Sequence, residues 1–389
     1  MTLFRTSTTI CSLLLALLSV FWVPTLAAQE MTRFGESARS LAMGGALTAL
    51  ADGFDAMLYN PAGLAQSTSW QATLTTWQEA SFSNAGGRGD IFFRSLGRGP
   101  GIDQTAVNTF LDTAAGVPQT ARDQNFFGFH TANGFGVAYY DTTRRHAQPA
   151  DPNDPSGSGL DLTYDRLTAS VFTFAFPTKR KLFSWGFSLK SLTREGDKRL
   201  AVSGAEIFSP GVDPRAATAG NSAYTIDVGL FTRIPSEFFR ATFGIAMLNG
   251  IAPDFGLPDL DPILPEVNVG LAIMPDLFGK NARLVLAADL RDVTQSAFPN
   301  DPDSGKRAHY GMEVSLFPQQ TGAWLLSLRA GTTQGLSSFG AGFMLRRWMT
   351  VDFVSYEEEM GPTGGASLPQ RRYLLQATLG LGALNPERR

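Results

Sequence analysis

Apolar and polar positions alternate with a period of two along most of the chain after residue 70, and this alternation predicts β-strands. It is clearest in residues 265–274, where Val267 and Val269 fall on one face and Glu266 and Asn268 fall on the other. Fourteen segments carry such a pattern and are expected to be strands: 70–79, 125–131, 134–145, 160–176, 183–195, 222–234, 239–249, 265–274, 282–293, 308–317, 323–333, 337–345, 348–356 and 371–381.

The connections between these segments alternate between short and long, apart from one tight connection near residues 333–336. An even number of antiparallel strands, with short turns at one rim and long loops at the other, is typical of bacterial outer-membrane barrels. The sequence therefore predicts an all-β fold, a transmembrane up-and-down β-barrel of about 14 antiparallel strands over residues 70–384. A soluble β-sandwich with one wet face is the alternative, and the regular hairpins favour the barrel.

The first 28 residues have the features of a secretory signal peptide, so the chain is expected in the bacterial outer membrane. Arg5 supplies the positive start, Ile10–Val23 is the apolar stretch, and small residues allow cleavage after Ala27 or Ala28. This stretch is shorter than the roughly 20 residues that a membrane-spanning helix needs. The only cysteine, Cys11, lies within it, so the mature chain is expected to have no disulfide and no cysteine ligand or nucleophile.

Residues 29–69 lack the two-residue alternation and are expected to form a hatch inside the barrel, with 385–389 as a periplasmic tail. Asn60 suits a helix N-cap and Pro61 suits the first helical position, so residues 60–66 are expected to form a short capped turn. Small residues at six positions between 42 and 51 allow close approach to a neighbouring wall.

Strand alternation points nine charged residues toward the lumen. Their mixed signs favour ion pairs within the lumen, and a polar path through it is the other interpretation. The nine residues are Asp227, Arg233, Arg240, Glu266, Arg283, Asp289, Arg291, Glu313 and Arg329. A formal net charge of -3 with no concentrated basic face gives no reason to expect a nucleic-acid partner.

No set of residues in the sequence makes a convincing catalytic or metal site, so neither enzymatic activity nor a cofactor is predicted. The three histidines, His130, His146 and His309, lie far apart along the chain. Asp-rich turns at 151–157 and 300–305 offer oxygen ligands for calcium, but the same residues are ordinary turn formers and their spacing breaks the EF-hand pattern.

The run from Ser37 to Ala65, SARSLAMGGALTALADGFDAMLYNPAGLA, resembles the N-terminal signature of the FadL-like outer-membrane superfamily. The residues of this motif are closer to those of the PorV/PorQ-like branch than to those of the fatty-acid transporters. The resemblance implies a fourteen-stranded barrel blocked by an N-terminal hatch. In the transporter branch, hydrophobic molecules bind in such a barrel and leave sideways through its wall. The residues that map to the hatch motif are Arg39, Gly44, Gly45, Asn60, Pro61, Ala62 and Gly63.

These observations predict passive passage of small hydrophobic compounds through the barrel, gated by the hatch. Aromatic side chains of Phe126, Phe127 and Phe129 facing the lumen would favour that function. The alternative is a PorV-like accessory barrel that binds secreted protein partners and transports nothing. Outer-membrane lipid and lipopolysaccharide are the other expected partners.

Overall fold

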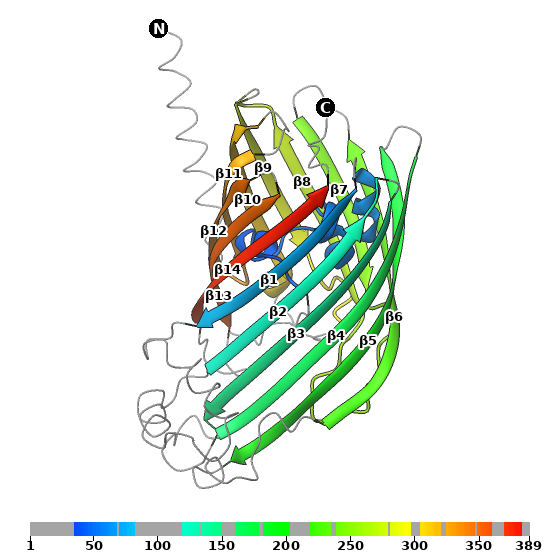
Figure 1. Ribbon diagram of the computed structural model, residues 1–389, viewed down its shortest axis with the longest axis vertical. Helices are drawn as coiled ribbons and strands as arrows, with labels where there is room; N and C mark the ends of the chain where they lie inside the picture. Colours follow the sequence, from blue (N-terminus) through cyan, green and yellow to red (C-terminus); the bar gives the residue numbers. More distant parts are fainter. Residues whose placement is uncertain are drawn as a thin grey trace.

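The computed structural model describes thirteen segments of the chain: residues 35–67, 70–81, 119–132, 134–149, 160–178, 182–202, 218–234, 239–278, 281–296, 304–319, 324–346, 348–359 and 369–382. Within them, fourteen antiparallel strands form a closed barrel in which each strand pairs with its neighbours in sequence and β1 pairs with β14 (Figure 1). Closure satisfies the backbone hydrogen bonds of every strand, as a lipid surrounding requires.

All fourteen predicted strands are present, so the predicted fold is confirmed. The strands are β1 Gln71–Ser81, β2 Gln119–His130, β3 Phe135–Pro149, β4 Leu160–Pro177, β5 Phe183–Val202, β6 Thr218–Ile234, β7 Phe239–Leu248, β8 Glu266–Pro275, β9 Ala282–Leu290, β10 Ala308–Pro318, β11 Trp324–Thr333, β12 Leu336–Arg346, β13 Met349–Glu359 and β14 Pro369–Gly382. The largest differences are at the start of β2 and the end of β5, which extend six and seven residues beyond the expected bounds. Both extensions are rich in polar residues, so they lack the apolar alternation that marked the rest.

The two faces of the wall differ residue by residue. Leu271 on β8 is 47% exposed, while its neighbours Gly270 and Ala272 are buried. On β2 the same alternation buries Phe126 in the lumen and turns Phe127 outward. Phe129 is also in the outward phase and contacts Trp70, so Phe126 alone of the three aromatics whose inward facing would favour hydrophobic passage faces the lumen. The reason is the strand period, which never places consecutive residues on one face.

The barrel wall is taller on one side than on the other. Strands β4, β5 and β6 have 18, 20 and 17 residues, whereas β7, β8 and β9 have 10, 10 and 9. Figure 1 shows β3 to β6 reaching well beyond the ends of β8 to β12. A spanning strand needs about 9–11 residues, so the tall side extends past the membrane. We assign this extension to the outer side because the short turns lie at the opposite rim.

The apolar belt on the outer face of the tall wall ends at a row of ion pairs. Arg166 on β4 bonds Asp141 at 2.8 Å and Glu195 at 3.3 Å, and all three side chains are in the outward phase. Tyr139, two residues before Asp141 on β3, is an exposed aromatic residue that faces outward. Charged groups are costly inside hydrocarbon, so this row marks the outer limit of the membrane on this side.

Residues 35–67 lie inside the barrel, where Figure 1 shows their helices in blue behind the front strands. We call them the luminal segment. It contains the α-helices α2 (Ala38–Ala42) and α3 (Gly53–Tyr59) and the 3-10 helix η1 (Pro61–Gln66). No helix in the described part of the chain has the length and apolar character needed to cross a membrane. The domain boundaries expected at residues 28, 69 and 384 fall outside the described residues and stay predictions.

Candidate functional site: the contacts of the luminal segment

Seven inward-facing glycines on β5 to β12 let the luminal segment touch the barrel wall at backbone distance. At each of them an added Cβ would lie 2.1–2.9 Å from an atom of residues 42–62, so a larger residue would displace the segment. Three pairs stand directly opposite each other on neighbouring strands: 186 with 229, 244 with 270, and 311 with 331. We call the set the glycine belt; it comprises Gly186, Gly229, Gly244, Gly270, Gly311, Gly331 and Gly340.

The paired glycines of the predicted hatch motif sit where the luminal segment turns against β10 and β11. Gly44 and Gly45 have φ angles of +58° and +82°, which favour glycine. The carbonyl oxygen of Gly44 lies 2.7 Å from Nδ1 of His309, and that of Gly45 accepts a 2.5 Å hydrogen bond from Arg291. An added Cβ on Gly44 would lie 2.5 Å from the backbone nitrogen of Thr332. Both glycines therefore serve close approach as well as the turn.

Asn60 joins three parts of the molecule through one side chain. Its Oδ1 accepts a hydrogen bond from the Ala62 amide and caps η1, which begins at Pro61. Its amide nitrogen donates to the carbonyl oxygens of Thr48, at 2.9 Å, and Leu230 on β6, at 3.1 Å. The capped turn predicted from sequence is confirmed. Its contact with β6 also fixes where η1 meets the wall.

The end of the luminal segment is held by neutral hydrogen bonds to β5. Ser184 donates to the carbonyl oxygen of Ala62 at 3.0 Å and accepts from the Gln66 side chain at 3.1 Å. Gly63 packs within the segment itself, because a Cβ there would lie 2.0 Å from the Ala51 oxygen. The motif residues thus divide between contacts to the wall and contacts inside the segment.

Arg39 is the charged link between the luminal segment and the wall. Its guanidinium contacts Glu313 on β10 at 3.2 Å, Asp52 at 3.1 Å and Asp55 at 3.8 Å. Burial lowers the pKa of Arg39, but the charge of Glu313 and of the two aspartates outweighs it and raises that pKa overall. Burial raises the pKa of Asp55 to about 6, although the charge of Arg39 opposes this.

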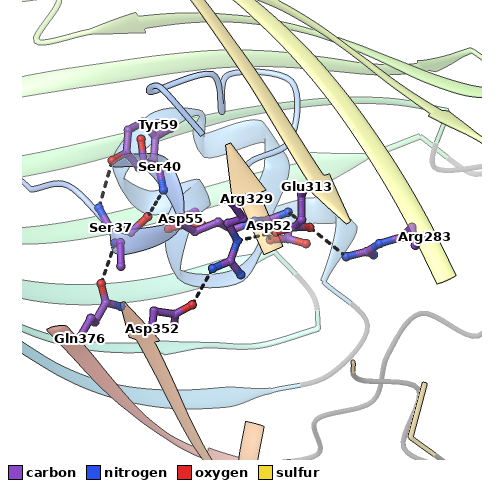
Figure 2. A network of polar contacts seen from close by, with 12 residues as sticks. Ser37, Ser40, Asp52, Asp55, Tyr59, Arg283, Glu313, Arg329, Asp352 and Gln376 are labelled. Carbon is purple, nitrogen blue, oxygen red and sulfur yellow. Dashed lines mark hydrogen bonds and ion pairs between the residues drawn. The ribbon is translucent and has the colours of Figure 1, made fainter. Parts of the chain in front are cut away.

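Glu313 is the centre of a wider network on the wall. It is 2% exposed and also accepts hydrogen bonds from Arg329 at 2.8 Å and Arg283 at 3.2 Å. Arg329 in turn contacts Asp352 on β13 at 2.6 Å. Figure 2 shows Glu313 between Arg283 and Arg329, with Asp352 on the far side of Arg329. Three arginines thus surround one buried carboxylate, and removing it would take away the counter-charge that they share, leaving Arg39 only its aspartates and Arg329 only Asp352.

The other charged residues expected in the lumen are not part of this network. Asp289 accepts a 2.7 Å hydrogen bond from the Thr48 amide, and Asp227 forms a buried 2.6 Å ion pair with Lys190. Glu266 is buried near the outer rim of β8. Arg233 and Arg240 lie near the short-turn rim, the first partly buried and the second exposed.

An apolar contact holds the other side of the luminal segment. Its side chains belong to one continuous buried cluster with residues of β2, β3 and β4. We call it the apolar seam; it consists of Met57, Leu58 and Leu64 from the segment and Phe126, Ala138, Tyr140, Val171 and Ala175 from the wall. The cluster continues outward through Leu167 and Leu192 to Phe255 in the 249–265 connection.

Sequence reasoning missed several residues that hold the segment. Gln376 on β14 accepts from the Ala38 amide at 2.7 Å, Ser338 on β12 donates to the Ala42 oxygen at 3.3 Å, and Arg122 on β2 bonds Glu36 at 2.7 Å. All three wall residues are in the inward phase of their strands, which is the only signal the sequence offered. Among the described residues, no group of three His, Cys, Asp or Glu side chains gathers to hold a metal ion.

Comparison with known proteins gives structural matches only. No protein-family model matches the chain, and no curated protein does. A mutant of the monoaromatic hydrocarbon channel TodX matches with a TM-score of 0.50 at 12% identity, covering 90% of this chain and 99% of that one. The monoaromatic hydrocarbon channel CymD matches with a TM-score of 0.50 at 11% identity, covering 89% and 98%.

A Pseudomonas aeruginosa FadL homologue also matches over 92% of this chain and 98% of its own, at 13% identity and a TM-score of 0.40. At such identities the likeness concerns architecture alone. The closed fourteen-stranded wall and its agreement with TodX and CymD over nearly the whole chain show that this protein has the fold of a FadL-like outer-membrane barrel.

Proposed function

We propose that the protein is a passive channel for small hydrophobic compounds in the outer membrane, with the luminal segment as its gate. The observation that carries the proposal is the buried apolar cluster that contains the apolar seam and also includes Phe255 of the outer connection. TodX and CymD, which share the fold, are described as monoaromatic hydrocarbon channels. That description supports a hydrophobic cargo for this chain.

The two sides of the luminal segment respond differently to an apolar compound. Such a compound can replace the packing of Leu64 against the wall without leaving a polar group unpaired. Separating Arg39 from Glu313 would instead expose buried charges to a surrounding that cannot solvate them, which costs about 3–5 kcal/mol. An apolar compound is therefore expected to pass along the apolar seam.

A sideways exit between β2, β3 and β4 is disfavoured by their pairing. The β2–β3 register runs unbroken from Gln119 to His130, and the β3–β4 register runs unbroken from Phe135 to Pro149. Opening either pair would remove ladder hydrogen bonds where no water can replace them. We propose that cargo moves within the lumen past the luminal segment, and this departs from the route that the resemblance implied.

The test uses the full chain in vesicles whose outer leaflet is lipopolysaccharide, because plain lipid already admits hydrocarbons. Influx of p-xylene and of sucrose is measured with and without protein. We expect protein to raise p-xylene influx several-fold and to leave sucrose influx at the protein-free level. A variant lacking residues 35–60 should admit sucrose as well, because the lumen is then open to water.

Equal p-xylene influx in vesicles with and without correctly inserted protein would defeat the proposal. The heat-dependent gel shift of folded barrels provides the insertion control. The accessory-barrel alternative stays a prediction, because most of the 197–221 loop on which it depends lies outside the described residues. Contact with lipopolysaccharide is proposed at the row of outward ion pairs around Arg166.

A further inference from the structure

Met57 fills a notch in the barrel wall that two glycines create. An added Cβ on Gly136 of β3 would lie 2.9 Å from Sδ of Met57 and 2.9 Å from Cδ2 of Leu64. An added Cβ on Gly128 of β2 would lie 3.2 Å from Cε of Met57 and 2.6 Å from the ring of Phe126. The wall is thus hollowed by two missing side chains, and one flexible thioether occupies the space.

His130 closes this notch at the short-turn rim. It pairs in register with Gly136 on one side and Gln71 on the other. His130 is 4% exposed, and neither ring nitrogen has a hydrogen-bond partner of acceptable geometry. The nearest point of the luminal segment is Gly53, whose added Cβ would lie 3.4 Å from Nε2. We call Met57, Leu64, Phe126, Gly128, His130 and Gly136 together the Met57 notch.

An imidazole buried without hydrogen-bond partners destabilises the fold, and a phenylalanine of similar shape would avoid that cost. The sequence nevertheless keeps a polar ring at the end of an otherwise apolar notch. A ligand that brings one hydrogen-bonding group to this point would satisfy the ring. Met57 is suited to yield to such a ligand, because methionine is unbranched and adapts its shape readily.

We propose that the Met57 notch is a binding subsite for a small neutral aromatic compound bearing one hydroxyl group. The aromatic ring takes the place of the Met57 side chain beside Phe126, and the hydroxyl pairs with a ring nitrogen of His130. This inference rests on the proposed function and specifies one class of its cargo.

The chemistry of the notch selects among aromatic ligands. Apart from His130 its residues are apolar, so a carboxylate, which needs several hydrogen-bond donors, would be left largely unpaired. A plain hydrocarbon would fit the apolar part but leave the imidazole unsatisfied. A phenol is apolar over its ring and both donates and accepts at one point. p-Cresol should therefore bind more tightly than p-xylene, from which it differs by one hydroxyl in place of one methyl.

The test measures binding of p-cresol and p-xylene to the detergent-solubilised full chain with 13C-methyl methionine labels. We expect saturable shifts of the Met57 methyl signal and about tenfold tighter binding of p-cresol, the ratio that one good hydrogen bond provides. His130→Phe should remove this preference by weakening p-cresol about tenfold while p-xylene keeps its affinity. His130→Gln, which can still hydrogen-bond, should restore part of the preference. Gly136→Val should block both ligands.

His146→Phe is the matched control, because His146 lies on β3 at the far end from the notch and should leave both affinities unchanged. Equal affinity of wild-type protein for the two ligands, or an undiminished p-cresol preference in His130→Phe, would overturn the subsite. If p-xylene influx through lipopolysaccharide vesicles persists in that case, the channel function stands and only the subsite fails. If p-cresol binds at the Met57 methyl but neither compound enters faster with protein, the subsite stands and the channel fails.

Discussion

The luminal segment is held in two different ways on its two sides. Toward β9–β14 it is fixed by charged and polar bonds, which we call the polar seam: Arg39 to Glu313, Thr48 to Asp289, Gly45 to Arg291, Gly44 to His309, Ala42 to Ser338 and Ala38 to Gln376. Toward β2–β4 it makes the apolar seam. The same segment therefore meets a mainly directional, polar surface on one side and a mainly non-directional one on the other. Each side has an exception: Glu36 bonds Arg122 on β2, and Ala42 belongs to a buried apolar cluster with Val354 and Leu374.

The difference supports the proposed assignment of one side of the segment as the anchor and the other as the side that opens. Polar bonds in a low-dielectric lumen are costly to break singly, because each leaves an unpaired partner behind. Apolar packing can be exchanged for an apolar solute at little cost. We interpret the polar seam as the anchor of the gate and the apolar seam as the passage.

Breaking the centre of the polar seam should have the largest effect. Glu313→Gln leaves Arg39, Arg283 and Arg329 without their shared carboxylate, so it should destabilise the docked segment by about 3–5 kcal/mol. Sucrose influx should rise, because the anchor is lost and water enters. Ser315→Ala, a buried inward residue two positions along β10, is the matched control and should leave the gate closed. A sucrose-tight Glu313→Gln protein would contradict the assignment of the anchor.

Acidity should sharpen the comparison, because Asp55 titrates on the anchored side. Its pKa is raised from 3.8 to about 6, so the docked state favours the protonated carboxyl. The stability it contributes is fully present below pH 4 and is lost as the pH rises through 6, amounting to about 3 kcal/mol in all. Hydrogen exchange of the α3 amides should therefore quicken between pH 5 and pH 7, after correction for the intrinsic rate. Asp55→Asn should remove this extra pH dependence. If the exchange rates of that variant vary with pH as in the wild type, Asp55 is not the group that titrates.

Asn60→Ala should have a smaller effect on a junction that belongs to neither seam. It removes the cap of η1 and two bonds to carbonyl oxygens, one of them on β6, so we expect a loss of about 2 kcal/mol. Proteolysis of residues 60–67 should accelerate while sucrose influx stays low, because the polar seam is intact. Asn60→Ser keeps an oxygen that can cap η1 but loses the two donated bonds, so its loss of stability should be smaller than that of Asn60→Ala. Influx as large as in Glu313→Gln would mean that the anchor extends to β6.

Strand count, strand order and the facing of most wall residues were predictable, because a period of two repeated fourteen times is a strong local signal. The polar extensions of β2 and β5 were not, since residues such as Arg122 and Asp197 give no apolar alternation. Their strand structure follows from pairing with neighbouring strands above the membrane. Phe127 and Phe129, whose facing the lumen would have favoured hydrophobic passage, both lie in the outward phase of β2.

The sequence by itself determined the strands of the barrel, the capped turn at Asn60 and the two glycines at the first block of the luminal segment, because each depends on residues close together in the chain. Only the tertiary structure decided which wall each part meets. Arg39 and Glu313 are 274 positions apart, and Met57 reaches Gly136 across 79, so no local pattern could join them. Barrel closure brings these residues together, and with them the division of the lumen into an anchored side and an apolar side.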